Sequence, residues 1–273
     1  MTNAAPTGAP SRSRGPGRRG RSWARAALVG VWALVLTGTG EASPRIDAAD
    51  RPDGTPARSG ATAPSRQGST PPATDVPVLL VPGWFDTDRD LAALQVRLVA
   101  AGWPSEHIDA ITFEDPTGSN RAHALQIASA VAGLLERTGA GAVDIVAHSM
   151  GGLSTRWYLR THAAAPVRRV VFLASPHHGT LSAHFAWGDG RDEMLPESPF
   201  LDTLNTGRAL PEGVEAITVR TLLDTHVIPP ESATLQGVPD HLVCCPTHDG
   251  LLRDREVFQI VRDFLVAPAD GGP

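Results

Sequence analysis

One stretch, from Gly141 to Tyr158, constrains the fold more than any other part of this chain. Its sequence is GAVDIVAHSMGGLSTRWY. Apolar residues at Val143 and at 145–147 predict a buried strand, and the pattern after 149–152 is helical. The four residues between these two elements are Ser-Met-Gly-Gly. We therefore expect a strand, a sharp turn and a helix, with Ser149 at the turn.

A serine at such a corner holds its hydroxyl clear of its own backbone. A base can then approach from one side and a substrate carbonyl from the other. The corner tolerates only small residues two positions before and after the serine, and here they are Ala147 and Gly151. A Gly-rich turn that ends an ordinary strand is the competing interpretation. The nucleophile hypothesis therefore needs an acid and then a histidine further along the chain.

Strand and helix patterns alternate through the rest of the chain from about residue 75. Strands are predicted at 76–81, 108–113, 143–147, 170–174, 216–223 and 241–245, and helices at 89–101, 122–138, after Ser149 and at 253–265. This alternation predicts an α/β fold, with a mostly parallel sheet of about six strands and helices on both faces. Ligands of such sheets bind at the carboxyl ends of the strands. The residues at or just beyond predicted strand ends are Trp84, Ser149, His177, Asp224 and His248.

A serine hydroxyl needs a base to take its proton and a carboxylate to orient that base. His248 is the preferred base, because it follows the last predicted strand and Gly250 lets its loop bend back over the sheet edge. His177 and His178 are the alternatives, and we expect them to line the pocket instead. His148 adjoins the serine, but we expect its side chain to point away from the reacting face.

Asp224 is the preferred acid because it ends a predicted strand next to that of the base. Asp is also common in caps and turns, and such a role is the alternative interpretation. Asp240 begins a strand, at the wrong end of the sheet, and Asp249 adjoins the base. The backbone N–H groups of Met150 and Trp84 are the expected donors to the oxyanion.

Regular alternation breaks down between residues 181 and 211, where large apolar residues are scattered among polar ones. This segment is either a lid that covers the serine in water or an irregular loop packed on the core. Phe85, in the loop after the first strand, and Leu251, after the base, are expected to contact substrate.

The stretch from Val76 to Leu265 resembles the small secreted bacterial lipases of the α/β-hydrolase fold, in particular the minimal type (lipase class 2) whose nucleophile motif reads A-H-S-M-G. The matching pieces are VLLVPGW (78–84), AAGW (100–103), VDIVAHSMGG (143–152), the strand end at Asp224 and the loop HDGLL (248–252). This chain has Pro82-Gly83 where such lipases usually have His-Gly. Its segment 181–211 is also longer than in the minimal type.

The resemblance implies hydrolysis of carboxylic esters of lipids, with Ser149, Asp224 and His248 as a triad and with Trp84 and Met150 as oxyanion donors. It implies no redox cofactor and no required metal. Lipid or small ester substrates, transient contact with a lipid interface and a monomeric protein are the expectations. An acyltransferase, phospholipase or polyester hydrolase would use the same triad, and a non-catalytic binding module is the alternative from another class.

The first 42 residues have the features of a secretory signal peptide. They carry six arginines, then an apolar run at 26–36 that is too short to span a bilayer, then small residues at 40 and 42. We expect an exported protein, although an uncleaved anchor and a twin-arginine signal are alternatives. Residues 43–74 are rich in Pro, Ser, Gly and Arg and predict a disordered linker. The folded domain is expected at 75–267, followed by a disordered tail at 268–273.

Charge and cysteine content narrow the function further. The whole chain has a net charge of −5, and residues 1–42 contribute six arginines and one glutamate, so the remainder carries −10. Such an acidic protein has no electrostatic footprint for nucleic acid. The two cysteines, Cys244 and Cys245, are adjacent. We favour buried thiols over a vicinal disulfide, and their spacing does not suit a metal site.

Overall fold

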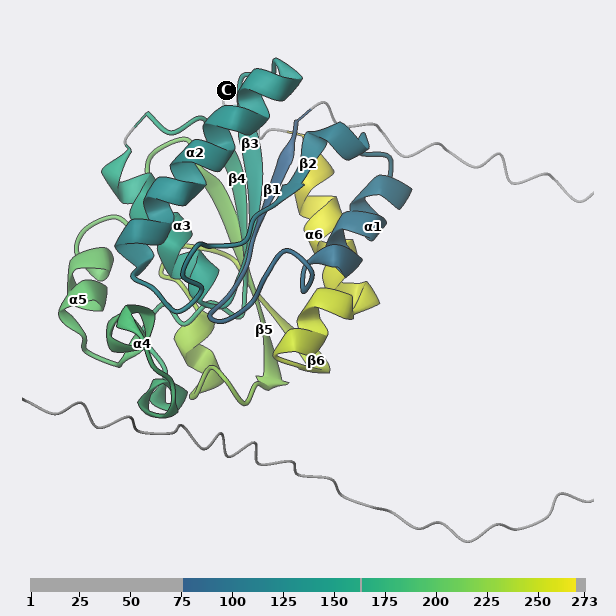
Figure 1. Ribbon diagram of the computed structural model, residues 1–273. Coiled ribbons are helices and arrows are strands. Elements are labelled where there is room, and N and C mark those ends of the chain that lie inside the picture. Colours follow the sequence, from purple (N-terminus) through teal and green to yellow (C-terminus); the bar gives the residue numbers. More distant parts are fainter. Residues whose placement is uncertain (1–75, 163, 269–273) are drawn as a thin grey trace, which may run out of the picture. The chain divides into compact units, whose positions relative to one another are not determined.

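The structure, a computed structural model, describes residues 76–162 and 164–268 (Figure 1). Within them, six strands form one sheet in the order β2-β1-β3-β4-β5-β6, and every neighbouring pair is parallel. The elements are β1 (Val78–Val81), α1 (Ala92–Ala100), η1 (Ser105–His107), β2 (Ile108–Ala110), α2 (Asn120–Thr138), β3 (Val143–His148), α3 (Met150–Thr161), β4 (Val167–Leu173), η2 (Leu181–Phe185), α4 (Asp189–Met194), α5 (Pro199–Asn205), β5 (Glu215–Leu223), η3 (Pro230–Ala233), β6 (Asp240–Thr247), η4 (Asp249–Arg253) and α6 (Arg255–Val266).

The expected signal peptide at 1–42 and linker at 43–74 lie outside the described residues and stay predictions. The same holds for the tail, except that residue 268 is described. No helix in the described residues is both long enough and apolar enough to cross a membrane.

Two apolar layers enclose the sheet, as the alternation of strands and helices predicts. Figure 1 shows α2 and α3 on one face and α1 and α6 on the other. Side chains of β3 serve the two layers alternately, because successive residues of a strand point to opposite faces. Ile145 and Ala147 pack in the cluster that includes α2, and Val146 packs in the cluster that includes α1 and α6. Every residue of β3 is buried, as expected for a parallel strand covered on both faces.

Pairing with neighbours explains where the strand bounds differ from expectation. β2 was expected to reach residue 113 but ends at Ala110, because its partner β1 has only four residues and the pairing stops at Leu80. β4 begins at Val167, three residues earlier than expected, because Val167 pairs with the first residue of β3. Composition alone carries no information about such pairing.

The segment between 181 and 211 contains three short helices that pack on α3. Met194, Phe200, Leu201 and Leu204 from this segment share an apolar cluster with Met150 and Leu153 of α3. The carboxylate of Glu193 in α4 accepts hydrogen bonds from Asn120 N–H at 2.6 Å and from Ser119 Oγ at 2.7 Å, at the start of α2. The segment thus packs on α3 through part of its side chains, while Phe185 and Trp187 remain exposed. The lid and the packed loop both stay predictions.

The expectation of buried cysteine thiols is wrong. Cys244 and Cys245 form a disulfide, and both residues are exposed. They lie in β6, which pairs only with β5 and is therefore an edge of the sheet. At this edge both cysteine side chains remain open to solvent, and the two sulfurs are bonded there.

Truncation of Phe200 should reveal how much the 181–211 segment contributes to stability. Phe200 is 3% exposed and packs against Trp157, so Phe200→Ala should lower the free energy of unfolding by about 3–5 kcal/mol. Phe185→Ala, a matched change at a residue that is 89% exposed, should change it by less than about 0.5 kcal/mol. Urea denaturation measures both. Equal, small effects would mean that the segment is not part of the core.

Candidate active site

Ser149 lies at the junction of β3 and α3 in a strained backbone conformation. Its φ is 50° and its ψ is −129°, a region that residues with a side chain rarely adopt. Its N–H donates to the carbonyl oxygen of Leu173 at the end of β4, at 2.8 Å, which anchors the corner to the sheet. Ser149 is 9% exposed. These are the features of a strand-to-helix corner that presents a serine hydroxyl to a pocket.

Small residues at this corner have a direct steric cause. A Cβ on Gly151 would overlap the carbonyl oxygen of Pro82, in the loop after β1. Ala147 is fully buried in the cluster on the α2 face, where its methyl group fits. The sequence expectation of small residues at both positions therefore has a packing explanation, and α3 starts in van der Waals contact with the neighbouring strand end.

His248 and Asp224 form a hydrogen-bonded pair at the carboxyl ends of β6 and β5. His248 Nδ1 lies 2.9 Å from Asp224 Oδ2, and both side chains are almost completely buried. The other oxygen of Asp224 accepts from the N–H groups of His226 and Val227, at 2.8 and 2.7 Å. Both carboxylate oxygens are thus held, which fixes the orientation of the imidazole.

Burial and charge set the protonation of this pair. Burial raises the pKa of Asp224, but the hydrogen bond from His248, its charge and two backbone N–H donors outweigh burial and hold the pKa below its ordinary value. For His248, burial lowers the pKa below its ordinary value, although the hydrogen bond to Asp224 opposes the shift. Near neutral pH, the aspartate is therefore ionised and the imidazole is neutral, the form that accepts a proton.

Ser149 and His248 line the same pocket, which has a volume of about 490 Å³. Within the described residues, no hydrogen bond joins Ser149 Oγ to His248. Catalytic hydrogen bonds are often long without substrate and tighten when it binds. The three residues expected from the sequence as nucleophile, base and acid thus meet at one edge of the sheet, and their roles stay a proposal.

Among the described residues, no acceptor is present for the N–H groups of the two expected oxyanion donors. Met150 is the first residue of α3, and the first N–H groups of a helix have no partner inside it. In the part of the chain that the structure describes, the N–H of Trp84 has no acceptor, whereas the N–H of Phe85 donates to Pro116 at 3.0 Å. Trp84 packs against the apolar cluster that contains Met150, and it lines the same pocket as Ser149.

Aromatic side chains form one wall of the pocket. Trp84, Phe85 and Trp187 contact one another with ring centroids 4.6–5.7 Å apart. The indole N–H of Trp84 donates to the carbonyl oxygen of Trp187 at 3.1 Å and joins the β1 loop to the 181–211 segment. Phe85, which the sequence placed near substrate, lines the pocket. Phe185 and Met194, from the segment considered as a lid over the serine, also line it. His226 and Val227 line it as well and were not expected from the sequence.

Comparisons with known proteins agree on the fold. A family model described as the alpha/beta hydrolase fold matches residues 76–201. Lipase B of Aspergillus fumigatus is similar over 72% of this chain and 54% of its own, at 18% identity and a TM-score of 0.62. The mature lipase BlEst2 of Bacillus licheniformis is similar over 70% of this chain and 92% of its own, at 16% identity and a TM-score of 0.60.

The product of gene lin2722 from Listeria innocua is similar over 71% of this chain and 96% of its own, at 15% identity and a TM-score of 0.57. This chain spans about half the length of the Aspergillus lipase. With the parallel sheet and the serine corner, these matches decide the architecture. The chain has the α/β-hydrolase fold.

In this α/β-hydrolase fold, three residues expected in the pocket lie elsewhere. His177 is completely buried against Phe172, its ring nitrogens have no partner within the described residues, and burial holds its pKa well below the ordinary value. His178 is exposed outside the pocket, and Leu251 packs in the core with α1 and α6. The chain after β4 turns at Ala174, where φ is 47°, and Pro176 and Thr180 line the pocket instead.

His148 also departs from expectation. Its side chain does not point away from the site, because its ring centroid lies 4.7 Å from that of His248. His148 follows Val146 on the face of β3 that α1 and α6 cover. The η4 turn that begins after His248 packs on that same face through Leu251 and Leu252. Strand periodicity therefore brings the two imidazoles together.

Two groups of side chains in the described residues have ligand atoms within 4.8 Å of one another. They are His148, His248 and Asp249, and Asp224, His226 and His248. Both groups contain His248. A metal ion bound to its ring would occupy a nitrogen that the base needs for proton transfer, so metal binding and base catalysis would compete at this residue.

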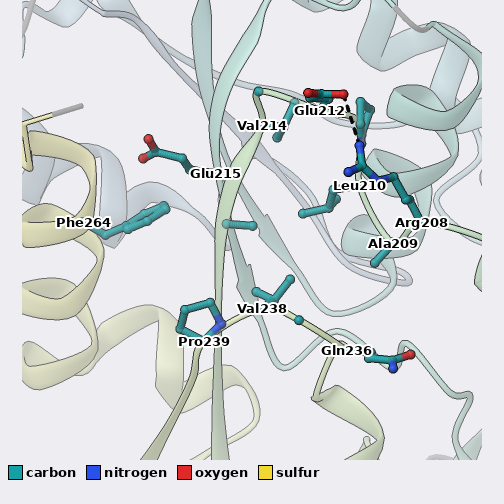
Figure 2. Close-up of a pocket in the computed structure, with 14 residues that line it drawn as sticks. Arg208, Ala209, Leu210, Glu212, Val214, Glu215, Gln236, Val238, Pro239 and Phe264 are labelled. Atoms are coloured by element: carbon teal, nitrogen blue, oxygen red, sulfur yellow. Dashed lines mark hydrogen bonds and ion pairs between the residues drawn. The ribbon is translucent and has the colours of Figure 1, made fainter. Parts of the chain in front are cut away.

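A second hollow of about 560 Å³ lies at the amino ends of β5 and β6, opposite to the ends that carry Asp224 and His248 (Figure 2). Figure 2 shows Arg208 and Glu212 paired on one side and Glu215 and Phe264 on the other. Its lining residues include no serine, cysteine or histidine. It therefore lacks the pair of a serine or cysteine with a histidine that the sequence predicts, and the pocket at Ser149 is the candidate active site.

A pair of glycine substitutions tests the packing at the corner. Gly151→Ala should lower the free energy of unfolding by more than about 3 kcal/mol or prevent folding, because its methyl group would overlap the Pro82 carbonyl. Gly133→Ala in α2 has no atom within 4 Å of the new methyl group and should stabilise the protein by about 0.5–1 kcal/mol. Denaturant titration followed by circular dichroism measures both. A Gly151→Ala protein as stable as the wild type would contradict this packing.

Proposed function

We propose that this chain is a serine hydrolase that cleaves carboxylic esters of lipids. One observation carries the proposal: a strained serine at the end of β3 shares a pocket with an aspartate-bound, neutral histidine. This combination supports nucleophilic attack by Ser149 with His248 as general base and Asp224 as its orienting carboxylate. The names of the Aspergillus and Bacillus neighbours, both lipases, agree with ester substrates.

The proposed reaction has two half-reactions. His248 takes the proton of Ser149 as the hydroxyl attacks the ester carbonyl, and the N–H groups of Trp84 and Met150 stabilise the oxyanion. The protonated His248 then gives that proton to the leaving alcohol, and an acyl-enzyme remains. Water, deprotonated by His248, attacks the acyl-enzyme. His248 then gives that proton to the Ser149 oxygen as the bond to the acyl group breaks, which releases the acid and restores the serine hydroxyl.

Pocket shape and composition support an apolar acyl group as the substrate part next to Ser149. Aromatic rings of the β1 loop and of the 181–211 segment supply one wall, and Met194 and Val227 add apolar side chains to the lining. The exposed side chains of Phe85, Phe185 and Trp187 surround this pocket and suit contact with a lipid surface. We infer that the substrate enters from this aromatic side.

Substitution of the nucleophile gives the first test. The wild-type protein should release p-nitrophenol from p-nitrophenyl esters and react with a fluorophosphonate probe, whereas Ser149→Ala should lose at least about 10⁴-fold of kcat and all labelling. Ser129→Ala, a matched change at an exposed hydroxyl of α2, should leave both unchanged. Labelling of the Ser149→Ala protein, or no labelling of the wild type, would refute the assignment of the nucleophile.

The pH dependence of hydrolysis gives the second test. Only neutral His248 can accept the proton of Ser149, so kcat/KM should fall on the acid side as His248 is protonated. Because the pKa of His248 lies below its ordinary value of 6.5, the pH at which kcat/KM reaches half of its maximum should also lie below 6.5. Initial rates in buffers of constant ionic strength measure the profile. A flat profile from about pH 5 to 8, the range in which histidine titrates, would contradict the role of His248.

A further inference from the structure

A second aspartate–imidazole pair lies beside His248. Asp86 belongs to the loop after β1, and His148 is the last residue of β3. His148 Nδ1 lies 3.2 Å from Asp86 Oδ2, and the His148 side chain is 1% exposed. The ring centroids of His148 and His248 are 4.7 Å apart. Neither Asp86 nor His148 takes part in the reaction steps given above.

Packing at Gly83 fixes this pair against the nucleophile. A Cβ built on Gly83 would lie 2.7 Å from Asp86 Oδ2, 2.9 Å from Ser149 Cβ and 3.3 Å from His148 Nδ1. Gly83 therefore lies where even one methyl group would meet all three side chains. The Asp86–His148 pair, the nucleophile and the oxyanion loop form one packed unit.

Hydrogen bonding alone does not account for an imidazole at position 148. The Nδ1 atom that meets Asp86 must carry a proton in order to donate. The other ring nitrogen, Nε2, is buried and has no partner within residues 76–162 and 164–268. Buried polar atoms almost always have partners, so an unpartnered one beside a proposed base points to a functional role. What the ring and its carboxylate can supply to His248 is charge.

Charged groups surround His248 on several elements. Asp224 and His226 follow β5, Asp249 begins η4, His148 ends β3, and Asp86 lies in the β1 loop. Burial lowers the pKa of His248 most, positive charge on His148 and His226 lowers it further, and Asp224 raises it. Burial raises the pKa of Asp86, but its hydrogen bond with His148 and the charges of His148 and His248 bring it below the ordinary value. This attraction is mutual, so ionised Asp86 also stabilises protonated His248.

We propose that Asp86 and His148 are positioning residues for ester hydrolysis, an inference that rests on the proposed function. Asp86 is a second carboxylate that stabilises the imidazolium formed on His248 when the proton of Ser149 moves to it. His148 holds the Asp86 carboxylate in place, and positive charge on its ring weakens the hold of His248 on that proton. Two carboxylates, Asp224 and Asp86, therefore stabilise the protonated form of His248, rather than Asp224 alone.

Direct titration of His248 tests the proposal without any need for catalysis. In a Ser149→Ala background, the imidazole of His248 is followed by NMR as pH is varied. Asp86→Asn should lower the titration midpoint of His248 by about half a pH unit, because a stabilising negative charge is lost. His148→Asn should raise the midpoint by a similar amount, because Asn retains a donor for Asp86 but carries no charge. Asp88→Asn, a matched change at an exposed residue of the same loop, should leave it unchanged.

Kinetics with Ser149 intact provides the second readout. The acid limb of kcat/KM should move in the same two directions in the Asp86→Asn and His148→Asn proteins. For Asp86→Asn, kcat should fall roughly threefold, the factor that matches half a pH unit, with KM within about twofold, because the lost interaction exists only when His248 is charged. Asp224→Asn should be impaired further when Asp86→Asn is added, because both of the proposed stabilising carboxylates are then lost.

Opposite shifts of the His248 midpoint in the two variants support the proposal. An unchanged midpoint in both, or a midpoint that rises in Asp86→Asn, overturns it. If Asp86→Asn does not fold, the His148→Asn midpoint decides alone: a rise supports the proposal and no change overturns it. Absence of esterase activity in the wild type would refute the proposed function, while the NMR midpoints would still report whether Asp86 and His148 control the charge of His248.

Discussion

Close contact between the start of α3 and the loop after β1 is the constraint on which this site depends. Gly151 leaves no room for a methyl group beside the Pro82 carbonyl, and Gly83 leaves none beside Ser149. The strained backbone of Ser149 is held by this contact and by its hydrogen bond to Leu173. Strain of this kind persists only where the surroundings determine the conformation from several sides. Here the ends of the two neighbouring strands, β1 and β4, provide these surroundings.

The architecture could be predicted from the sequence because each apolar run of a buried parallel strand stands out from its helical neighbours. The serine, aspartate and histidine were found for a related reason: each follows a strand, and parallel strands bring their carboxyl ends to one edge. The predicted bounds of the strands were less accurate, because β2 ends where its pairing with β1 ends and β4 begins where its pairing with β3 begins. The cysteines were misjudged because the sequence does not tell which strand lies at an edge.

The pocket lining was the least predictable part of the site. His177 and His178 follow a strand as Ser149 does, yet the left-handed residue Ala174 redirects the chain and His177 turns into the core. Nothing in the pattern announces such a turn, because an alanine there has no sequence signal of the kind that glycine gives. Phe185 and Trp187, by contrast, stood out as large apolar residues in an irregular segment. The sequence does not show that these two side chains stay exposed while others of the segment pack on α3.

The hydrogen bond from the Trp84 indole to residue 187 constrains substitutions at position 84 but not at position 187. Its acceptor is a main-chain oxygen, which every residue type at 187 possesses, whereas its donor is a side chain that only tryptophan provides in this form. Variation at position 187 can therefore reshape the aromatic wall while the tie between the two segments persists. A substitution at position 84 removes the donor and with it the hydrogen bond. The aromatic wall can therefore change at position 187 without loss of this link, but not at position 84.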